Sequence, residues 1–596
     1  MNITLGVISF NFSKAVLQST DRLFDIVQDH IHETSDCLAS SKQYRSIEDG
    51  VWIANECLSG PWSKSPWIET NDELLSFSAP PIPLYDINDL RYQEELLENT
   101  KNDRDLNRFL SGHFGMRYDV KARKFKAWAD TLGLARCYWV QNERYLAVSN
   151  SITPLLYFTD CGVEIDTVEW MSFGGFGWFT GNGSPFREVN RLAAGEVITS
   201  EGGKRGTIHK YTEVDDLVRP RGGITKASLA ETVEEMSTIA CNASKLTTEP
   251  PVINLSGGKD SRLTAAVWLS AKKPATIFTN ATISGEGDVA KDLVNSLPFK
   301  IEDIGVNHNI VSQSVSLVTH DKVEPIPLQE RAMHLMRHFD GDAAPIALKI
   351  SSINRGRLRR LSIGGGGGEI AHGNYYNSPE VFRRVQNLDY TFERIAHSYS
   401  TQYGVTDAGK LEIEARLRSW YDQAASLDID KISRLDFFYL TQRFRRWPLS
   451  GADTSALMLY SSPKFVRLAF DATPHQRYDA YIQRELTGSF INQWKNKDYF
   501  KASQSDSKIV NRKNLRMWQG SDREWILDTL SYGEGISEIW DIEFIIKRLN
   551  EIEAGQGGNW HESVIQRAVW YETFLKHVTT LSVRISKAKK SLGIGP

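Results

Sequence analysis

The amino-acid sequence predicts an α+β N-terminal part built as an antiparallel sandwich, followed by an α/β part with a parallel sheet and a helical C-terminal region. Short strand-like segments separated by turn residues fill positions 1 to about 215. Beyond them, strands alternate with helices, which is the pattern of a parallel, doubly wound sheet. With 596 residues, the chain is also too long for one hydrophobic core.

The N-terminal part is predicted to be mostly β. Strands are expected at 112–120, 125–130, 137–141 and 145–150, and a further strand pair begins within 189–197. Residues 219–223 (Arg-Pro-Arg-Gly-Gly) form the clearest linker, because proline and paired glycines interrupt helices and strands alike. The predicted domains therefore span 1–218 and 224–596.

The second domain is predicted from its alternation of elements. Ser228 and Glu231 have capping-box spacing ahead of a helix that runs to Ala240. Strands are expected at 252–255, 275–279 and 300–306, with helices at 263–269 and 288–297. Ligands of such sheets bind at the carboxyl ends of the strands. Thr279 and Asn280 fall at such an end, where they either contact a nucleotide base or form a polar exit from the strand.

The hexapeptide Ser-Gly-Gly-Lys-Asp-Ser at 256–261 is the most informative stretch of the chain. Its glycines let the backbone approach a ligand closely, and the unpaired amides of the following helix attract phosphate. The familiar phosphate loop requires Ser or Thr after Gly-Lys, whereas Asp260 stands here. A carboxylate beside phosphates is favourable when a divalent cation lies between them. The hexapeptide therefore predicts a magnesium–nucleotide site, and the alternative is an ordinary glycine turn.

A second glycine cluster, 364–368, follows a short apolar strand and precedes Glu369. Five consecutive glycines are costly in chain entropy inside a packed domain, so we expect another group to approach this backbone closely.

Further along, amphipathic helices are expected at 435–447 and 464–470. Arg443, Arg445 and Arg446 form a basic cluster in the first of these helices. The cluster is either a solvated helix face, which we favour, or a receptor for a phosphate or a substrate carboxylate.

The composition excludes several classes of protein. Hydrophobic residues make up 41% and charged residues 24%, as in an ordinary globular protein, and the net charge of -4 does not favour nucleic-acid binding. No apolar run approaches the length of a membrane span. The five scattered cysteines are expected to be packing residues in a reducing compartment, which favours the cytoplasm. The 16 tryptophans suit either large interdomain contacts or a peptide groove.

At 256–261 the chain resembles the PP-loop ATP pyrophosphatase family, whose members cleave ATP between the α- and β-phosphates. The resemblance implies that ATP is bound by Leu255, Ser256, Gly257, Gly258, Asp260, Ser261, Thr279, Asn280, Gly364 and Gly365. Asparagine synthetases and β-lactam synthetases place a magnesium-binding acid after a glycine-rich turn, which implies Asp260 and Glu369 as metal ligands. The alternative for Glu369 is a solvated charge at a helix start. Gly366 stands where both families carry a catalytic side chain, so no general base is assigned.

Residues 493–500 (QWKNKDYF) resemble the asparagine synthetase segment that carries an essential lysine. The resemblance places this lysine at Lys497, whose ammonium would neutralise charge on the α-phosphate as pyrophosphate leaves. Lys495 and Lys501 are competing cations, and an ordinary exposed lysine is the alternative.

The first domain resembles the glutaminase domain of asparagine synthetases in its repeated strand pairs, its Asp130–Gly133 turn and its turn near Gly195. Those glutaminases use a cysteine at position 2 as the nucleophile, whereas this chain has Asn2. We therefore expect no glutamine hydrolysis, and a domain that is a structural remnant or a docking surface.

Without ammonia from glutamine, the amine must arrive with the substrate. The chain is most similar to a lasso peptide cyclase, an AMP-forming carbon–nitrogen ligase that adenylates an Asp or Glu side chain of a peptide and joins it to the peptide's N-terminal amine. This resemblance implies ATP and Mg²⁺ as cofactors. It also implies a lasso precursor peptide, a leader-processing protease and a leader-binding protein as partners. The alternatives are a small-molecule amide or β-lactam synthetase, a glutamine-independent asparagine synthetase homologue, and a non-catalytic peptide-binding scaffold.

Overall fold

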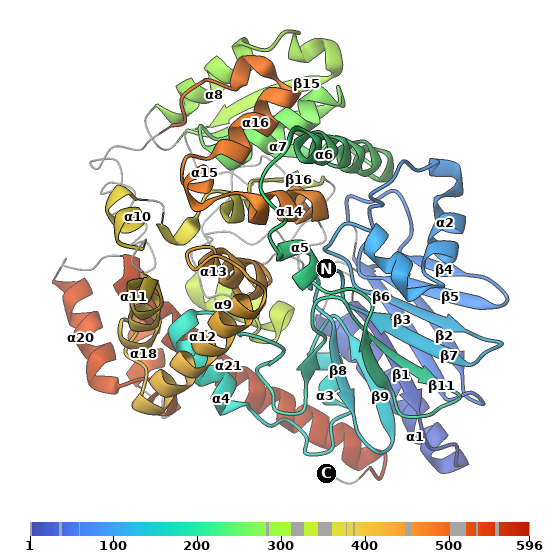
Figure 1. Ribbon diagram of the computed structural model, residues 1–596. Coiled ribbons are helices and arrows are strands. Elements are labelled where there is room, and N and C mark those ends of the chain that lie inside the picture. The colour runs from blue at the N-terminus through green and yellow to red at the C-terminus, as the bar shows by residue number, and fades with distance from the viewer. Residues whose placement is uncertain are drawn as a thin grey trace.

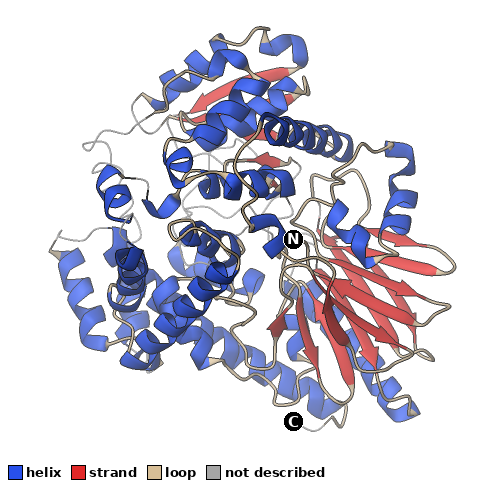
Figure 2. Cartoon of the chain, viewed as in Figure 1, coloured by secondary structure: helices blue, strands red, loops and turns tan. Residues whose placement is uncertain are grey.

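The computed structural model describes residues 3–34, 38–58, 60–281, 285–311, 327–343, 360–376, 378–385, 388–446, 455–500, 520–531, 535–554 and 559–594. Within them, the strands up to Lys210 form two antiparallel sheets, and the strands from Val252 onward form one parallel sheet. Helices surround the parallel sheet and make up most of the C-terminal region (Figure 1, Figure 2). The predicted combination of antiparallel sheets, a parallel sheet and a helical C-terminal region is confirmed.

The two antiparallel sheets have six strands each among the described residues. The first has the order β10 (Asn190–Arg191), β8 (Tyr138–Gln141), β9 (Tyr145–Ser149), β1 (Ile3–Ser9), β3 (Val51–Leu58) and β2 (Leu38–Ser46). The second has the order β12 (Thr207–Lys210), β11 (Glu196–Glu201), β7 (Lys124–Trp128), β6 (Gly115–Asp119), β5 (Glu73–Phe77) and β4 (Trp67–Glu69). Strands β6 to β9 lie where strands were predicted.

The two sheets pack face to face as a sandwich. Their shared core contains Ile8, Ile53, Met116, Phe125 and Ile198. Because alternate residues of a strand point to opposite faces, each sheet also joins a second core. Val7 and Trp52 of the first sheet pack with α1 (Lys14–Thr34), whereas Phe77 of the second shares a core with the parallel sheet.

The Asp130–Gly133 turn is built around a buried carboxylate. Asp130 accepts hydrogen bonds from the backbone amides of Leu132 at 3.0 Å, Leu134 at 3.1 Å and Ala135 at 2.7 Å. Gly133 has φ +64°, a left-handed conformation that favours glycine. The turn is therefore held by local hydrogen bonds.

The parallel sheet has the order β15 (Val306–Val311), β14 (Ala275–Asn280), β13 (Val252–Asn254), β16 (Ser362–Ile363) and β17 (Ala456–Leu457). The helices around it include α6 (Lys226–Leu246), α7 (Lys259–Ser270) and α8 (Glu286–Asn295). The prediction of a strand at 300–306 is wrong, because Ile301–Ile304 form a 3-10 helix that ends at the left-handed Gly305. The predicted capping box is also displaced, since Thr225 caps α6 and pairs with Ser228 at 3.0 Å.

A second group of helices gathers beside the sandwich (Figure 1). It consists of α4 (Thr167–Phe176), α9 (Leu328–Phe339), α10 (Pro379–Val385), α11 (Leu388–Thr401), α12 (Asp407–Ser426), α13 (Arg434–Phe438), α18 (Gly520–Ser531), α19 (Ile536–Ile539), α20 (Ile542–Glu553) and α21 (Asn559–Ser591). The helices α14 (Pro463–Asp471), α15 (Pro474–Tyr478) and α16 (Tyr481–Phe490) lie instead with α5 (Asp215–Val218), α6 and α7. The short α3 (Thr153–Leu156) packs on β8 and β9, and α2 (Tyr92–Asn99) shares a core with the second sheet. The predicted helix at 435–447 is not one α-helix, because α13 passes into a π-helix, η7 (Tyr439–Phe444).

Buried tryptophans join segments that are distant in the sequence. Trp170 of α4 has its ring 4.7 Å from that of Tyr571 and 4.6 Å from that of Phe574, both on α21. This packing accounts for part of the high tryptophan content.

Two further expectations can be compared with the structure. Cys161 is exposed, so the prediction that the cysteines are packing residues is wrong there. Cys37 lies outside the described residues. In the part of the chain that the structure describes, no helix has both the length and the apolar character needed to cross a membrane.

Candidate active site at the two glycine loops

The first glycine loop joins β13 to α7 and is closed by its own serines. Ser256 Oγ and Ser261 Oγ lie 2.7 Å apart, and Gly258 N donates to Ser256 Oγ at 3.1 Å. Gly258 is the N-cap of α7 and provides no side-chain hydrogen bond to the helix. A helix start without a side-chain cap leaves backbone amides that suit an anion.

Asp260 lies in the first turn of α7 and is held by three side chains from distant segments. Its Oδ2 is 2.9 Å from His372 Nε2, and its Oδ1 accepts from Gln483 Nε2 at 3.3 Å. Its backbone carbonyl accepts from the Tyr460 hydroxyl at 2.6 Å. The carboxylate is therefore fixed in orientation while a fifth of its side chain remains exposed, at 20%.

The second glycine loop packs directly on Asp260. A Cβ added at Gly365 would lie 2.8 Å from Asp260 Cβ, and one at Gly368 would lie 2.3 Å from Asp260 Oδ1. Gly367 has φ +95°, and a Cβ there would lie 2.5 Å from the Phe444 ring. Asp260 and Phe444 thus make the close approach that the glycine run predicts. At Gly366 the nearest neighbour of such a Cβ would be 3.5 Å away, which is ordinary contact.

Glu369 lies in the first turn of a short 3-10 helix, η5 (Gly368–Ala371). Its Oε2 accepts from the backbone amide of Gly367 at 2.9 Å. Burial raises the pKa of Tyr439, and the nearby Glu369 carboxylate raises it further. Glu369 therefore caps its own helix start and also contacts the π-helix η7.

Asp260 and Glu369 belong to one electrostatic cluster. Burial lowers the pKa of Lys259, and both carboxylates oppose that shift. Burial also raises the pKa of Tyr460, and both carboxylates add to the increase. In the described part of the chain, no group of three or more His, Cys, Asp or Glu side chains could hold a metal ion. A magnesium ion at Asp260 and Glu369 would have to take its other ligands from phosphate and water, as at many nucleotide sites.

The predicted lysine segment lies against the first glycine loop. Phe500 N donates to Gly257 O at 2.9 Å, and the carbonyls of Lys497 and Asp498 each accept from Arg262 at 2.7 Å. The Lys497 ammonium, however, forms an ion pair with Asp292 of α8. Lys495 pairs with Glu485 of α16 at 2.9 Å, and Lys501 lies outside the described residues.

The two predicted base-binding residues differ in position. Thr279 is buried, and its hydroxyl donates to Leu255 O at 2.8 Å and lies 2.9 Å from His308 Nε2. Its side chain therefore ties neighbouring strands together. Asn280 is exposed at the carboxyl end of β14.

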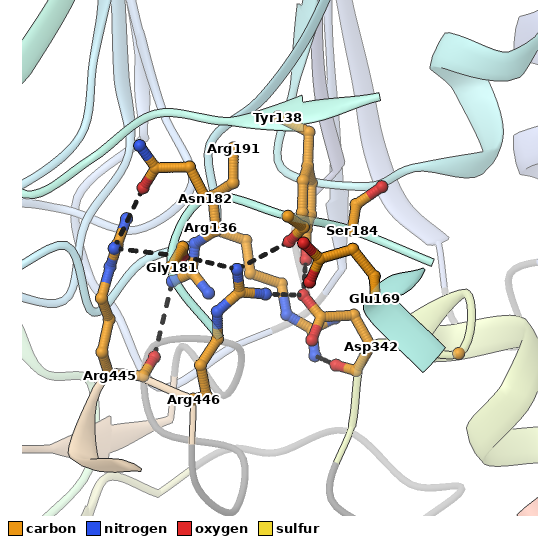
Figure 3. Close-up of polar contacts among 12 residues, drawn as sticks. Arg136, Tyr138, Glu169, Gly181, Asn182, Ser184, Arg191, Asp342, Arg445 and Arg446 are labelled. Atoms are coloured by element: carbon orange, nitrogen blue, oxygen red, sulfur yellow. Dashed lines mark hydrogen bonds and ion pairs between the residues drawn. The ribbon is translucent and has the colours of Figure 1, made fainter. Parts of the chain in front are cut away.

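The interpretation of the arginine cluster as a solvated face is wrong. Arg445 and Arg446 are each only 6% exposed. The Arg443 guanidinium is enclosed by aromatic rings, 5.7 Å from the centroids of Trp178 and Tyr439. The reason is tertiary, because the segment leading into β10 covers this end of the helix, and its Gly181 carbonyl accepts hydrogen bonds from both Arg445 and Arg446 (Figure 3).

Several site residues were not indicated by the sequence. They are Arg262, His372, Tyr439, Tyr460 and Gln483, each in contact with one of the glycine loops or with the residues that those loops carry. His372 follows Glu369 by three residues, which is the only local signal among them.

Comparison with known proteins assigns no family. No family model and no curated protein matches the chain. Similar solved structures include the allosteric regulatory enzyme of purine biosynthesis, with 9% identity, coverage of 60% of this chain and 94% of that chain, and a TM-score of 0.23. They also include the glutamine phosphoribosylpyrophosphate amidotransferase from B. subtilis complexed with ADP and GMP, with 7% identity, coverage of 61% and 81%, and a TM-score of 0.20. At these TM-scores neither likeness supports an inference about this chain.

Proposed function

We propose that this protein is an AMP-forming carbon–nitrogen ligase that activates a carboxylate with ATP and joins it to an amine. One observation carries the proposal: the second glycine loop packs on Asp260, which brings Asp260 and Glu369 together beside the uncapped start of α7. Carboxylate ligands suit Mg²⁺, and backbone amides with closely approaching glycines suit the phosphates of ATP.

The residues present fit such a complex. Asp260 and Glu369 would hold Mg²⁺, and the amides at the start of α7 would bind phosphate. His372 and Gln483 orient the Asp260 carboxylate through their hydrogen bonds to its two oxygens. When bound, ATP supplies the adenylyl group that activates the acid. Lys497 would stabilise charge at the α-phosphate after its ammonium leaves Asp292, while its backbone stays anchored by Arg262.

For the substrate we propose a lasso precursor peptide, whose Asp or Glu side chain is joined to its N-terminal amine as a macrolactam. The support is the resemblance of the two glycine loops and of 493–500 to asparagine synthetases, together with Asn2 in place of a nucleophilic cysteine. Met1 and Asn2 lie outside the described residues. In this proposal, 1–218 is a glutaminase-like domain without glutaminase activity, 224–596 is the ligase, and a leader protease and a leader-binding protein supply the peptide.

The substrate proposal is tested by mass spectrometry of a candidate core peptide incubated with the protein, ATP and Mg²⁺. A product lighter by one water, whose fragmentation links the N-terminal amine to an acidic side chain, is expected. Unchanged core peptides, together with amide formation on small-molecule acids and amines, would reject the peptide substrate in favour of a small-molecule synthetase.

A further inference from the structure

The π-helix η7 and the two arginines after it touch both the candidate active site and the sandwich. A π-helix leaves the regular α-helical register, and such segments are frequently found at functional sites. Here the irregularity spans Tyr439–Phe444, directly after α13. The same few residues therefore connect two parts of the molecule.

At its active-site side, η7 holds the second glycine loop. The Tyr439 side chain lies close enough to Glu369, the proposed magnesium ligand, for the carboxylate to raise the pKa of the Tyr439 hydroxyl. The Phe444 ring lies so close to Gly367 that no other residue fits there without displacement. The Tyr439 and Phe444 rings lie nearly parallel, with their centroids 6.3 Å apart and an interplanar angle of 12°, so both side chains of η7 face the second glycine loop side by side.

At its other side, η7 is bound by the turn at residues 180–183, in the segment that leads from α4 to β10 of the sandwich. Gly181 N donates to Gln442 Oε1 at 2.9 Å. Gly181 O in turn accepts from Arg445 Nη1 at 3.3 Å and from Arg446 Nη2 at 3.0 Å. Arg446 Nη2 also donates to Gly183 O at 2.8 Å.

This attachment is specific because it is made by buried polar groups. Arg446 forms an ion pair with Asp342 at 2.8 Å, and their side chains are 1% and 5% exposed. Arg445 donates to the carbonyl of Leu192 at 2.6 Å. Buried cations are costly unless their N–H groups find acceptors, and the sandwich supplies these acceptors at defined positions. A shift of η7 along the sandwich would break several of these bonds together.

We propose that the turn at 180–183 sets the position of η7, and thereby of Phe444 against Gly367, whose amide holds Glu369, so that Gln442 is a positioning residue for the proposed magnesium site. The role given to Glu369 rests on the proposed function. The sandwich then acts as a fixed support for the ligase site.

The test uses Gln442→Leu, which removes the acceptor for Gly181 N, and Gln442→Glu, which retains an acceptor. Hydrogen–deuterium exchange is measured across 361–371, together with the Mg²⁺ concentration that gives the half-maximal rate of AMP formation. Gln442→Leu should raise exchange at 364–370 and the Mg²⁺ requirement, each by about tenfold, and Gln442→Glu should restore both. Ser151→Ala, which removes a 3.0 Å bond between the loop after β9 and Asp340 at the end of α9, away from η7, should change neither.

Faster exchange confined to 180–183 and 442–446, with wild-type exchange at 364–370, would overturn the inference. If Gln442→Leu fails to fold, the same measurements are made on Arg445→Lys. This variant keeps the positive charge, but its shorter side chain no longer reaches Gly181 O in the turn. Hydrogen–deuterium exchange can be measured without substrate, so it tests the positioning role of Gln442 independently of activity. If the wild-type protein forms no AMP, that result rejects only the proposed function.

Discussion

His372 Nε2 lies 2.9 Å from Asp260 Oδ2, and both side chains are largely buried beside the two glycine loops. One follows the second glycine loop and the other begins α7, so the contact ties the loops together. A residue that orients a metal ligand in this way affects metal use without touching the metal.

Removal of the His372 donor is expected to weaken the site. His372→Leu should lower ATP turnover by about tenfold, because Asp260 loses one of its two side-chain hydrogen bonds. His372→Gln places an amide nitrogen near the position of Nε2 and should keep most of the activity. Equal turnover in His372→Leu and wild-type protein would show that the contact does not serve the site.

The proposed metal ligands give a prediction about magnesium. Asp260→Asn and Glu369→Gln each replace a charged oxygen donor with a neutral group of nearly the same shape, so each should raise the Mg²⁺ concentration needed for activity. Titration of Mg²⁺ at fixed ATP measures the effect. Removal of Mg²⁺ with a chelator should abolish activity in wild-type protein. Wild-type magnesium dependence in both variants would reject the assignment.

The lysine segment gives a prediction that separates chemistry from binding. Lys497→Met should lower turnover by roughly a hundredfold or more with little change in nucleotide affinity, while Lys495→Met should be mild. Asp292→Asn should not reduce turnover, because it only releases the Lys497 ammonium. If Lys495→Met abolishes product and Lys497→Met does not, the essential lysine has been placed two residues too late.

The buried pair Arg446–Asp342 is expected to matter for stability. Arg446→Met leaves Asp342 buried without its ion-pair partner and should lower the free energy of unfolding by about 3–5 kcal/mol, measured by denaturant titration. The exposed pair Lys121–Asp72 is the control, and Lys121→Met should change the free energy of unfolding far less, because both side chains are solvated. Comparable costs for the two variants would contradict the role given to burial.

His30 predicts a pH dependence of stability. The pKa of His30 is lowered from 6.5 to about 4, mainly by burial and to a smaller extent by the positive charge of the nearby Arg584. The unfolded chain therefore binds a proton before the folded chain does, so stability is full above pH 6.5 and falls as the pH decreases toward 4. Protonation of His30 lowers the free energy of unfolding by up to about 3 kcal/mol. His30→Gln should flatten the curve over this range, and parallel curves for the two proteins would refute the assignment.

Much of the fold could be predicted because its signals are local. Strand periodicity located β6 to β9, and turn-forming glycines located the first loop between β13 and α7. The error at 300–306 has a local cause, because a 3-10 helix over Ile301–Ile304 and the left-handed Gly305 delay the start of the strand to Val306.

The arginine cluster and most of the site depend on distant contacts. Arg445 is buried because its acceptors lie on Gly133, Gly181 and Leu192, far away in the sequence. Likewise, Asp260 and Glu369 were singled out from their own loops, but nothing near His372 or Gln483 indicates that both contact Asp260. Sheet order brings these segments together, and one sequence does not reveal it.

The most direct test of the central claim is the identity of the nucleotide product. Purified protein is incubated with ATP, Mg²⁺ and a substrate that it converts, and the products are separated by ion-exchange chromatography. Asp260→Asn serves as the background control. The account predicts AMP and pyrophosphate in equal amounts, formed together with the amide. ADP and inorganic phosphate in their place would contradict it.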